Sequence, residues 1–140
     1  MRKRFFIFPI LVTLAVLLIT QTALYANPSQ IVYLHSSEII IKTGQASWYS
    51  KESPGINKYT ANNEVFNDSD FTAAMWDVPF NQKVRVTNLE NGKSVIVRVN
   101  DRGPHRRFVE EGRLIDLTKQ AFASIASLDK GLIDIKLEIL

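Results

Sequence analysis

Hydrophobic and polar residues alternate most regularly along residues 83–99. Valine occupies every second position on both sides of the Asn91-Gly92 dipeptide, at 84 and 86 before it and at 95, 97 and 99 after it. An alternating pattern is typical of a strand with one buried face, and Asn-Gly readily adopts positive φ in a tight turn. The pattern therefore predicts a β-hairpin with a tight turn at Asn91-Gly92 and the valines on one face.

The same alternation predicts the orientation of Asp101. If the second strand continues to residue 101, Asp101 shares the apolar face with Val97 and Val99, while Arg98 and Asn100 point to the opposite face. A desolvated carboxyl group has a raised pKa and is suited to act as an acid. The alternative is turn chemistry, in which the aspartate caps local N–H groups and the following Gly-Pro ends the strand.

Shorter apolar stretches flank the hairpin. They predict strands at residues 46–50, 71–74, 114–117 and 133–139. Apolar residues at helical spacing between 117 and 128, followed by Gly131, predict one short helix. Several short strands with one helix favour a small β-barrel over a sandwich.

The first 26 residues have the pattern of a secretory leader. Arg2, Lys3 and Arg4 precede an apolar stretch of 15 residues, and Ala26 supplies a small residue for cleavage. Because a bilayer-spanning helix needs about 20 apolar residues, we expect cleavage after Ala26 rather than an uncleaved anchor. Export to the periplasm or cell envelope follows from this prediction. Residues 27–43 are expected to form an extended linker, and residues 44–140 the domain.

The net charge of +3 lies entirely in this leader. The chain has 17 basic and 14 acidic residues, and the three basic residues of the leader account for the difference. The remainder is balanced, so it lacks the basic footprint that nucleic-acid binding requires.

Cysteine is absent from the sequence. An exported domain without disulfides relies on its hydrophobic core, and a lipid anchor on an N-terminal cysteine is not possible. We expect a monomer without a covalent lipid anchor. The two histidines, His35 and His105, belong to no cluster with ligand spacing, so neither a metal nor a cofactor is expected.

A series of short motifs follows along residues 44–140. In order they are Gly44-x-Ala46-Ser47-Trp48-Tyr49, Thr60-Ala61-x-x-Glu64-x-Phe66, Thr72-Ala73-Ala74, Pro79-Phe80, Val84-x-Val86-Thr87-Asn88, Asn91-Gly92, Val97-x-Val99-Asn100-Asp101-Arg102-Gly103-Pro104 and Ile115-Asp116-Leu117. This series resembles the rare-lipoprotein-A (RlpA-like) family. The resemblance implies a six-stranded double-psi β-barrel and an endolytic transglycosylase of peptidoglycan that leaves 1,6-anhydromuramyl ends and takes part in cell wall organisation.

The resemblance also implies site residues. They are Asp101, Glu64 and a histidine at position 75, where this chain has Met75. Asn63 and Asn81 stand where the family usually has glycine, and because asparagine tolerates positive φ best, we expect the backbone to be preserved. The loop at residues 105–113 is longer than in the family, which leaves open that its histidine folds back over the site.

One carboxyl group suffices for the implied reaction. A hydrolase generally needs two, but here the muramyl 6-hydroxyl replaces water and attacks its own anomeric carbon. The same group therefore protonates the leaving oxygen and then accepts the hydroxyl proton. Asp101 would fill this role, and Glu64 would orient the sugar or stabilise the oxocarbenium-like state. The alternative is that Asp101 is an ordinary turn residue and Glu64 is a solvated residue of a loop.

Aromatic and basic residues are candidates for binding peptidoglycan glycan strands. They are Trp48, Tyr49, Trp76, Arg102 and His105. Aromatic faces suit sugar C–H surfaces, but Trp48 is also a candidate for the core. Arg102 and neighbouring arginines would meet acidic lactyl groups, although exposed charge is usually solvated surface.

Two other functions compete with this interpretation. A non-catalytic, expansin-like module that binds peptidoglycan would keep the groove without turnover, and Met75 favours it. An interaction protein of the cell envelope would bind protein partners without affinity for glycans.

Overall fold

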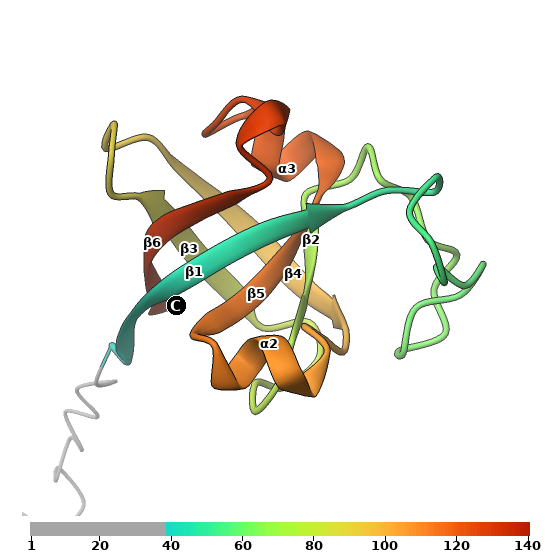
Figure 1. Ribbon diagram of the computed structural model, residues 1–140. Helices are drawn as coiled ribbons and strands as arrows, with labels where there is room; N and C mark the ends of the chain where they lie inside the picture. Colours follow the sequence, from blue (N-terminus) through green and yellow to red (C-terminus); the bar gives the residue numbers. More distant parts are fainter. Residues whose placement is uncertain (1–38) are drawn as a thin grey trace, which may run out of the picture. The chain divides into compact units, whose positions relative to one another are not determined.

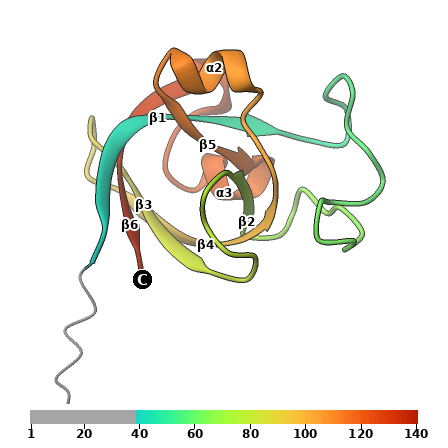
Figure 2. The same ribbon diagram turned by 90° about the horizontal axis from the view of Figure 1, so that it is seen from below.

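The structure, a computed structural model, describes residues 39–140, which form a closed barrel of six strands. Around the barrel the strands follow the order β1-β5-β2-β4-β3-β6 (Figure 1). Two neighbouring pairs, β1 with β5 and β2 with β4, are parallel, and the others are antiparallel. Seen from below, the strands surround a common centre (Figure 2). The fold is the small β-barrel that the strand pattern predicts and the six-stranded double-psi β-barrel that the family resemblance implies.

All strands and helices of the described chain are short. The strands are β1 (Ile41–Tyr49), β2 (Thr72–Met75), β3 (Lys83–Asn88), β4 (Ser94–Asp101), β5 (Arg113–Thr118) and β6 (Leu132–Ile139). The helices are α2 (Arg106–Glu110), α3 (Lys119–Ala123) and the 3-10 helix η2 (Leu128–Lys130). In residues 39–140, no helix has the length and apolar character needed to cross a membrane. The predicted leader at 1–26 and the linker up to residue 38 lie outside the described residues.

The predicted hairpin is confirmed, but its turn is longer than expected. The paired valines are Val84 with Val97 and Val86 with Val95. Pairing between β3 and β4 ends at Thr87, and the Asn88 N–H donates to the carbonyl of Lys93 over 2.9 Å. Within the Asn91-Gly92 dipeptide only Gly92 has positive φ, at 72°. The turn is therefore wider than the tight turn predicted at Asn91-Gly92.

Two boundaries and one additional helix differ from the sequence analysis. β1 begins at Ile41, which pairs with Glu138, so the barrel starts before the predicted boundary at Gly44. The predicted helix at 117–128 is reduced to α3, because Leu117 and the residue after it pair within the sheet and this tertiary pairing overrides helical spacing. The additional helix α2 has no buried residue, so its sequence has no apolar periodicity from which a helix could be predicted.

The core consists of the inward-facing residues of the strands together with α3. Its largest fully buried side chain is Phe122 of α3, the helix at the upper end of the barrel in Figure 1. The alternation predicted for the hairpin and for the last strand is present in the core, which includes Val84, Val86, Val95, Val97, Val99, Ile133, Ile135 and Leu137. With no cysteine in the chain, this core is the main source of stability.

Candidate active site

A β-bulge at the end of β4 determines the position of Asp101. Opposite Ala73 and Ala74 of β2, β4 has three residues, Val99, Asn100 and Asp101. The extra residue reverses the alternation, so Val99 lies in the core whereas Asp101 pairs with Ala74, which belongs to a second apolar cluster separate from the core. The prediction that Asp101 shares the apolar face of Val99 is therefore wrong.

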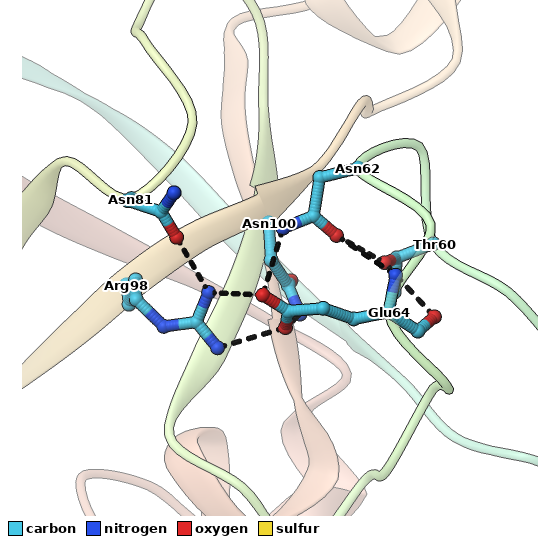
Figure 3. Close-up of polar contacts among 6 residues, drawn as sticks. All are labelled: Thr60, Asn62, Glu64, Asn81, Arg98 and Asn100. Atoms are coloured by element: carbon cyan, nitrogen blue, oxygen red, sulfur yellow. Dashed lines mark hydrogen bonds and ion pairs between the residues drawn. The ribbon is translucent and has the colours of Figure 1, made fainter.

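Glu64, in the loop between β1 and β2, accepts hydrogen bonds from three side chains (Figure 3). Arg98 donates to both carboxylate oxygens, from Nη1 to Oε1 over 2.7 Å and from Nη2 to Oε2 over 2.8 Å. Asn100 Nδ2 donates to Oε2 over 3.0 Å, and Asn62 Nδ2 donates to Oε1 over 2.8 Å. Arg98 Nη1 also donates to Asn81 Oδ1 over 2.9 Å. The network ties the loop to the outer face of β4.

These donors keep Glu64 ionised. The hydrogen bonds from Arg98, then Asn100 and Asn62, lower the pKa of Glu64 to about 2. A carboxylate that remains deprotonated at neutral pH cannot donate a proton to a substrate. The arrangement fixes Glu64 as an oriented anion that is paired with the Arg98 guanidinium.

Asp101 lies on the wall of a cleft of about 760 Å³. The rest of the lining comes from residues 55–61, Asn63 and Arg102. Asp101 Oδ1 accepts the backbone N–H groups of Ala61 over 2.9 Å and of Arg102 over 2.8 Å. Within residues 39–140, Oδ2 has no hydrogen-bond partner. The carboxyl group is therefore oriented through one oxygen and has the other available to a ligand.

Tyr59 was missed as a candidate and lines the same cleft. Its side chain is 54% exposed, and the Lys58 ammonium lies 5.4 Å from the centre of its ring. The sequence signal that could have identified Tyr59 as a candidate is an aromatic residue within a polar loop. Tyr59 offers an exposed aromatic face in the same cleft as Asp101.

Asp116 was also missed and lies in the same row of residues across the strands. It pairs with Ser47 of β1 and with Ala74 of β2, and Ala74 pairs in turn with Asp101. Ser47 Oγ donates to Asp116 Oδ1, and Arg113 Nη1 lies 3.8 Å from the same oxygen. Burial raises the pKa of Asp116, and the Ser47 hydrogen bond and the Arg113 charge oppose this shift. The signal in the sequence was a charged residue within the apolar stretch 114–117.

Tyr49 lies near both acids but is covered. Its ring stacks on Phe66 with 4.8 Å between ring centres, and its buried hydroxyl has no hydrogen-bond partner in the described part of the chain. Burial, then the charges of Asp101 and Asp116, raises the pKa of Tyr49 well above its usual value. Tyr49 therefore provides a protonated phenol beside the two carboxyl groups, and its ring is not an open sugar platform.

Gly103 lets the chain after Asp101 pass close to this row. A Cβ atom at Gly103 would lie 3.1 Å from the Ala74 Cβ and 3.4 Å from Asp116 Oδ2. Gly103 and Pro104 are both buried. The Gly-Pro segment therefore covers Asp116, whereas Asp101 remains on the wall of the cleft.

Two positions of interest lie at the end of β2: Met75, where the resemblance implies a histidine, and the candidate Trp76. Met75 is 2% exposed and belongs to the barrel core, so the position where the family resemblance implies histidine is closed to the cleft. Trp76 is half-buried, and its Nε1 donates to the carbonyl of Pro104 over 2.7 Å. Trp76 therefore stabilises the position of the segment that follows Asp101.

The structure does not bring Trp48 and His105 into the cleft. Trp48 packs against the core, and its Nε1 donates to the carbonyl of Leu128 over 3.1 Å. His105 is exposed and caps α2, with its Nδ1 accepting the N–H of Arg107 over 3.4 Å. The contacts of His105 in the described chain do not include Asp101 or Glu64.

Metal ligands are not gathered in the described residues. Residues 39–140 contain no group of three or more His, Cys, Asp or Glu side chains arranged to hold a metal ion. The polar groups around the cleft instead bind one another and the backbone.

A family model described as "Lytic transglycolase" matches residues 41–137. This match covers more than half of the chain and nearly all of the barrel. The chain belongs to the RlpA-like lytic transglycolase family. The "Probable endolytic peptidoglycan transglycosylase RlpA" of Synechocystis is 46% identical over 100 residues, which are 71% of this chain and 29% of that protein. The "Endolytic peptidoglycan transglycosylase RlpA" of Rickettsia felis is 40% identical over 107 residues, 76% of this chain and 45% of that protein.

The chain thus spans less than half the length of these RlpA relatives. Among solved structures, the "Streptomyces papain inhibitor (SPI)" matches with a TM-score of 0.56 and 24% identity, over 72% of this chain and 94% of that one. At this identity the likeness shows the fold alone. Because the same barrel is found in a protein named as a protease inhibitor, the function must be argued from the site.

Proposed function

We propose that this protein is an endolytic lytic transglycosylase that cleaves the MurNAc-GlcNAc linkage of peptidoglycan and leaves 1,6-anhydromuramyl ends, and so takes part in cell wall organisation. The observation that carries the proposal is the position of Asp101. Its carboxyl group is oriented on the wall of the cleft through Oδ1, and a fixed anion, Glu64, is held on the outer face of the same strand through Arg98 and Asn100.

Asp101 would act first as an acid and then as a base. In its protonated form it gives its proton to the glycosidic oxygen as the bond from this oxygen to the muramyl anomeric carbon breaks. The muramyl 6-hydroxyl oxygen then bonds to the anomeric carbon, and its proton passes to Asp101, which restores the starting state. The attack is intramolecular, so no bound water is needed as a nucleophile.

Glu64 would stabilise the positive charge that develops on the sugar ring. Its two oxygens are held by Arg98 and two asparagine amides, so the charge needs no reorganisation as the reaction proceeds. Tyr59 would offer an aromatic face to the sugars bound in the cleft.

Replacing Asp101 with asparagine tests this proposal. Asp101→Asn keeps the acceptor oxygen for the N–H groups of Ala61 and Arg102, so the variant should fold, while release of 1,6-anhydromuramyl products falls by roughly a hundredfold to ten-thousandfold. The products are measured by mass spectrometry of digested peptidoglycan, with Asp129→Asn, an exposed carboxylate of η2, as the control. Equal rates for wild type and folded Asp101→Asn would show that Asp101 is only a turn residue.

A non-catalytic module that binds peptidoglycan is the second candidate. It is favoured by the burial of Met75, because no histidine of the described chain contacts Asp101. Binding to peptidoglycan without any anhydro product from the wild type would support it.

The protein is proposed to act in the periplasm or cell envelope after removal of residues 1–26. The basic, apolar and small-residue pattern of the leader supports this. An intact mass of envelope-extracted protein that still includes these residues would contradict it.

A further inference from the structure

A buried phenol lies behind the two carboxyl groups of the candidate site. Tyr49 is 8% exposed and stacks on Phe66, and its hydroxyl has no hydrogen-bond partner in residues 39–140. A polar group that is removed from water without gaining a partner lowers stability. The ring alone would fill the same space, so the hydroxyl adds nothing to the packing. A buried hydroxyl of this kind therefore points to a role in the site.

The position of Tyr49 on β1 directs it towards the acids. Trp48 packs against the barrel core, and successive side chains of a strand point to opposite faces, so Tyr49 faces away from the core. There it belongs to the second apolar cluster together with Ala74 of β2. Ala74 pairs with Asp101 of β4 on one side and with Asp116 of β5 on the other. The phenol is therefore packed on the residue that joins the two acids.

Both carboxyl groups act on the phenol. The charges of Asp101 and Asp116 add to burial in raising the pKa of Tyr49 well above its usual value. The cations on the same strands have other partners, because Arg102 donates to a backbone carbonyl and Arg113 lies 3.8 Å from Asp116. The phenol therefore keeps its proton at neutral pH and meets an anion as a hydrogen-bond donor.

The carboxyl group of Asp101 has room for one further donor. A carboxylate accepts about four hydrogen bonds, two at each oxygen. Oδ1 already accepts the N–H groups of Ala61 and Arg102, whereas Oδ2 has no partner among the described residues. Tyr49 does not line the cleft, so its hydroxyl would reach Oδ2 from the side of the protein and leave the cleft side to substrate. Met75 lies in the core and carries a thioether, so it supplies no strong donor here.

We propose that Tyr49 is a positioning residue whose hydroxyl donates a hydrogen bond to Oδ2 of Asp101 while Asp101 is an anion during the reaction. This inference rests on the proposed function. Asp101 is an anion after it has protonated the glycosidic oxygen and before it accepts the proton of the muramyl 6-hydroxyl. Tyr49 keeps its own proton throughout, and a preorganised donor stabilises charge where it develops. Hydrogen bonds to catalytic groups are often long in ligand-free proteins and shorten when substrate binds.

The variant Tyr49→Phe tests the proposal because it removes the hydroxyl and keeps the ring that stacks on Phe66. A hydrogen bond to a charged group is lost, so the kcat for release of 1,6-anhydromuramyl products should fall roughly tenfold to a hundredfold. KM should change by less than about twofold, because the covered phenol does not contact the sugars. The urea midpoint should not fall, since the hydroxyl has no partner in the described chain.

The matched control is Thr72→Val. Thr72 is also buried, its hydroxyl likewise has no partner in residues 39–140, and valine keeps its shape. Because Thr72 pairs with Arg98 rather than with either acid, this control should keep the wild-type kcat. An unchanged kcat in folded Tyr49→Phe, or an equal loss of kcat in both variants, would overturn the inference.

A second measurement needs no turnover. The carbon-13 NMR signal of the Tyr49 Cζ atom, which is identified among the four tyrosines by its loss in Tyr49→Phe, is followed as the pH is lowered. The signal should shift in a step in the wild type and in Asp129→Asn, and the step should be absent in Asp101→Asn. No step in the wild type, or a step that disappears only in Asp116→Asn, would overturn the inference.

The two measurements also separate this inference from the proposed function. A step that depends on Asp101 in a wild type that releases no anhydro products would keep the contact between Tyr49 and Asp101 and reject the proposed reaction. Anhydro products released by Tyr49→Phe at the wild-type rate would keep the proposed reaction and reject the role of Tyr49.

Discussion

At the scale of single residues, Arg98 determines the charge state of Glu64. We expect Arg98→Gln to raise the pKa of Glu64 from about 2 towards 4.5, because the largest stabilising influence on the carboxylate is removed. A carboxyl-carbon NMR titration measures this pKa directly. Arg85→Gln, which removes an arginine from the neighbouring strand β3, is the control and should leave the pKa unchanged.

The contact between Arg98 and Glu64 makes the free energy of unfolding depend on pH. The folded-state pKa of Glu64 lies below its value in the unfolded chain, so the stabilisation is complete above about pH 4.5 and is lost as the pH falls towards 2. The difference in unfolding free energy between wild type and Arg98→Gln should therefore shrink over this range. The difference in unfolding free energy should be modest, because the Glu64 side chain is 39% exposed and solvent screens its ion pair with Arg98. A difference that is constant with pH would contradict this linkage.

Local backbone preferences were readable from the sequence. Asn63 and Asn81 both have φ of 69°, which confirms the expectation that asparagine takes a conformation usually reserved for glycine. Asn81 also accepts a hydrogen bond from Arg98, which glycine could not do. The orientation of Asp101 could not be read in this way, because the bulge at Asn100 depends on pairing with β2, which is distant in the sequence.

At the scale of the elements, the row formed by β1, β5, β2 and β4 contains a half-buried acid, Asp116. Burial raises the folded-state pKa of Asp116 above its ordinary value of 3.8, so its protonated form contributes stability that is present below about pH 3.8 and is lost as the pH rises through the folded-state value. Asp116→Asn cannot ionise. The variant should therefore gain stability relative to wild type as the pH rises from about 3.8 through the folded-state pKa of Asp116, as measured by urea unfolding at each pH. A relative loss over the same range would show that Ser47 and Arg113 favour the charged form more than burial opposes it.

The alternating strands could be predicted from the sequence, whereas the bounds of α3 and the existence of α2 could not. Valine at every second position of β3 and β4 reflects a buried face that the sequence records directly. Leu117 fits a helical spacing equally well, and only its pairing with Trp48 and Ala73 assigns it to β5. Asp116 was missed as a site residue for the same reason, since its partners come from two other strands.

At the scale of the whole molecule, stability depends on a core that no disulfide supports. Phe122 is fully buried, and Phe122→Ala should lower the free energy of unfolding by about 3–5 kcal/mol. This is a large part of the roughly 5–15 kcal/mol that a domain possesses. Denaturant unfolding measures the change, with Ile96→Ala, at a site that is 47% exposed, as the control. Similar losses for the two variants would show that α3 adds little to the core.

The pairing of β6 with β1 and β3 determines when the barrel can close during folding. β6 fills the gap between β1 and β3 with only eight residues, and it is the last of the described strands to leave the ribosome (Figure 2). Until then β1 and β3 each have an unpaired edge, to which another chain or a chaperone can add a strand. The barrel therefore cannot close until β6 has been made, and its folding must wait for contacts between the two ends of the domain.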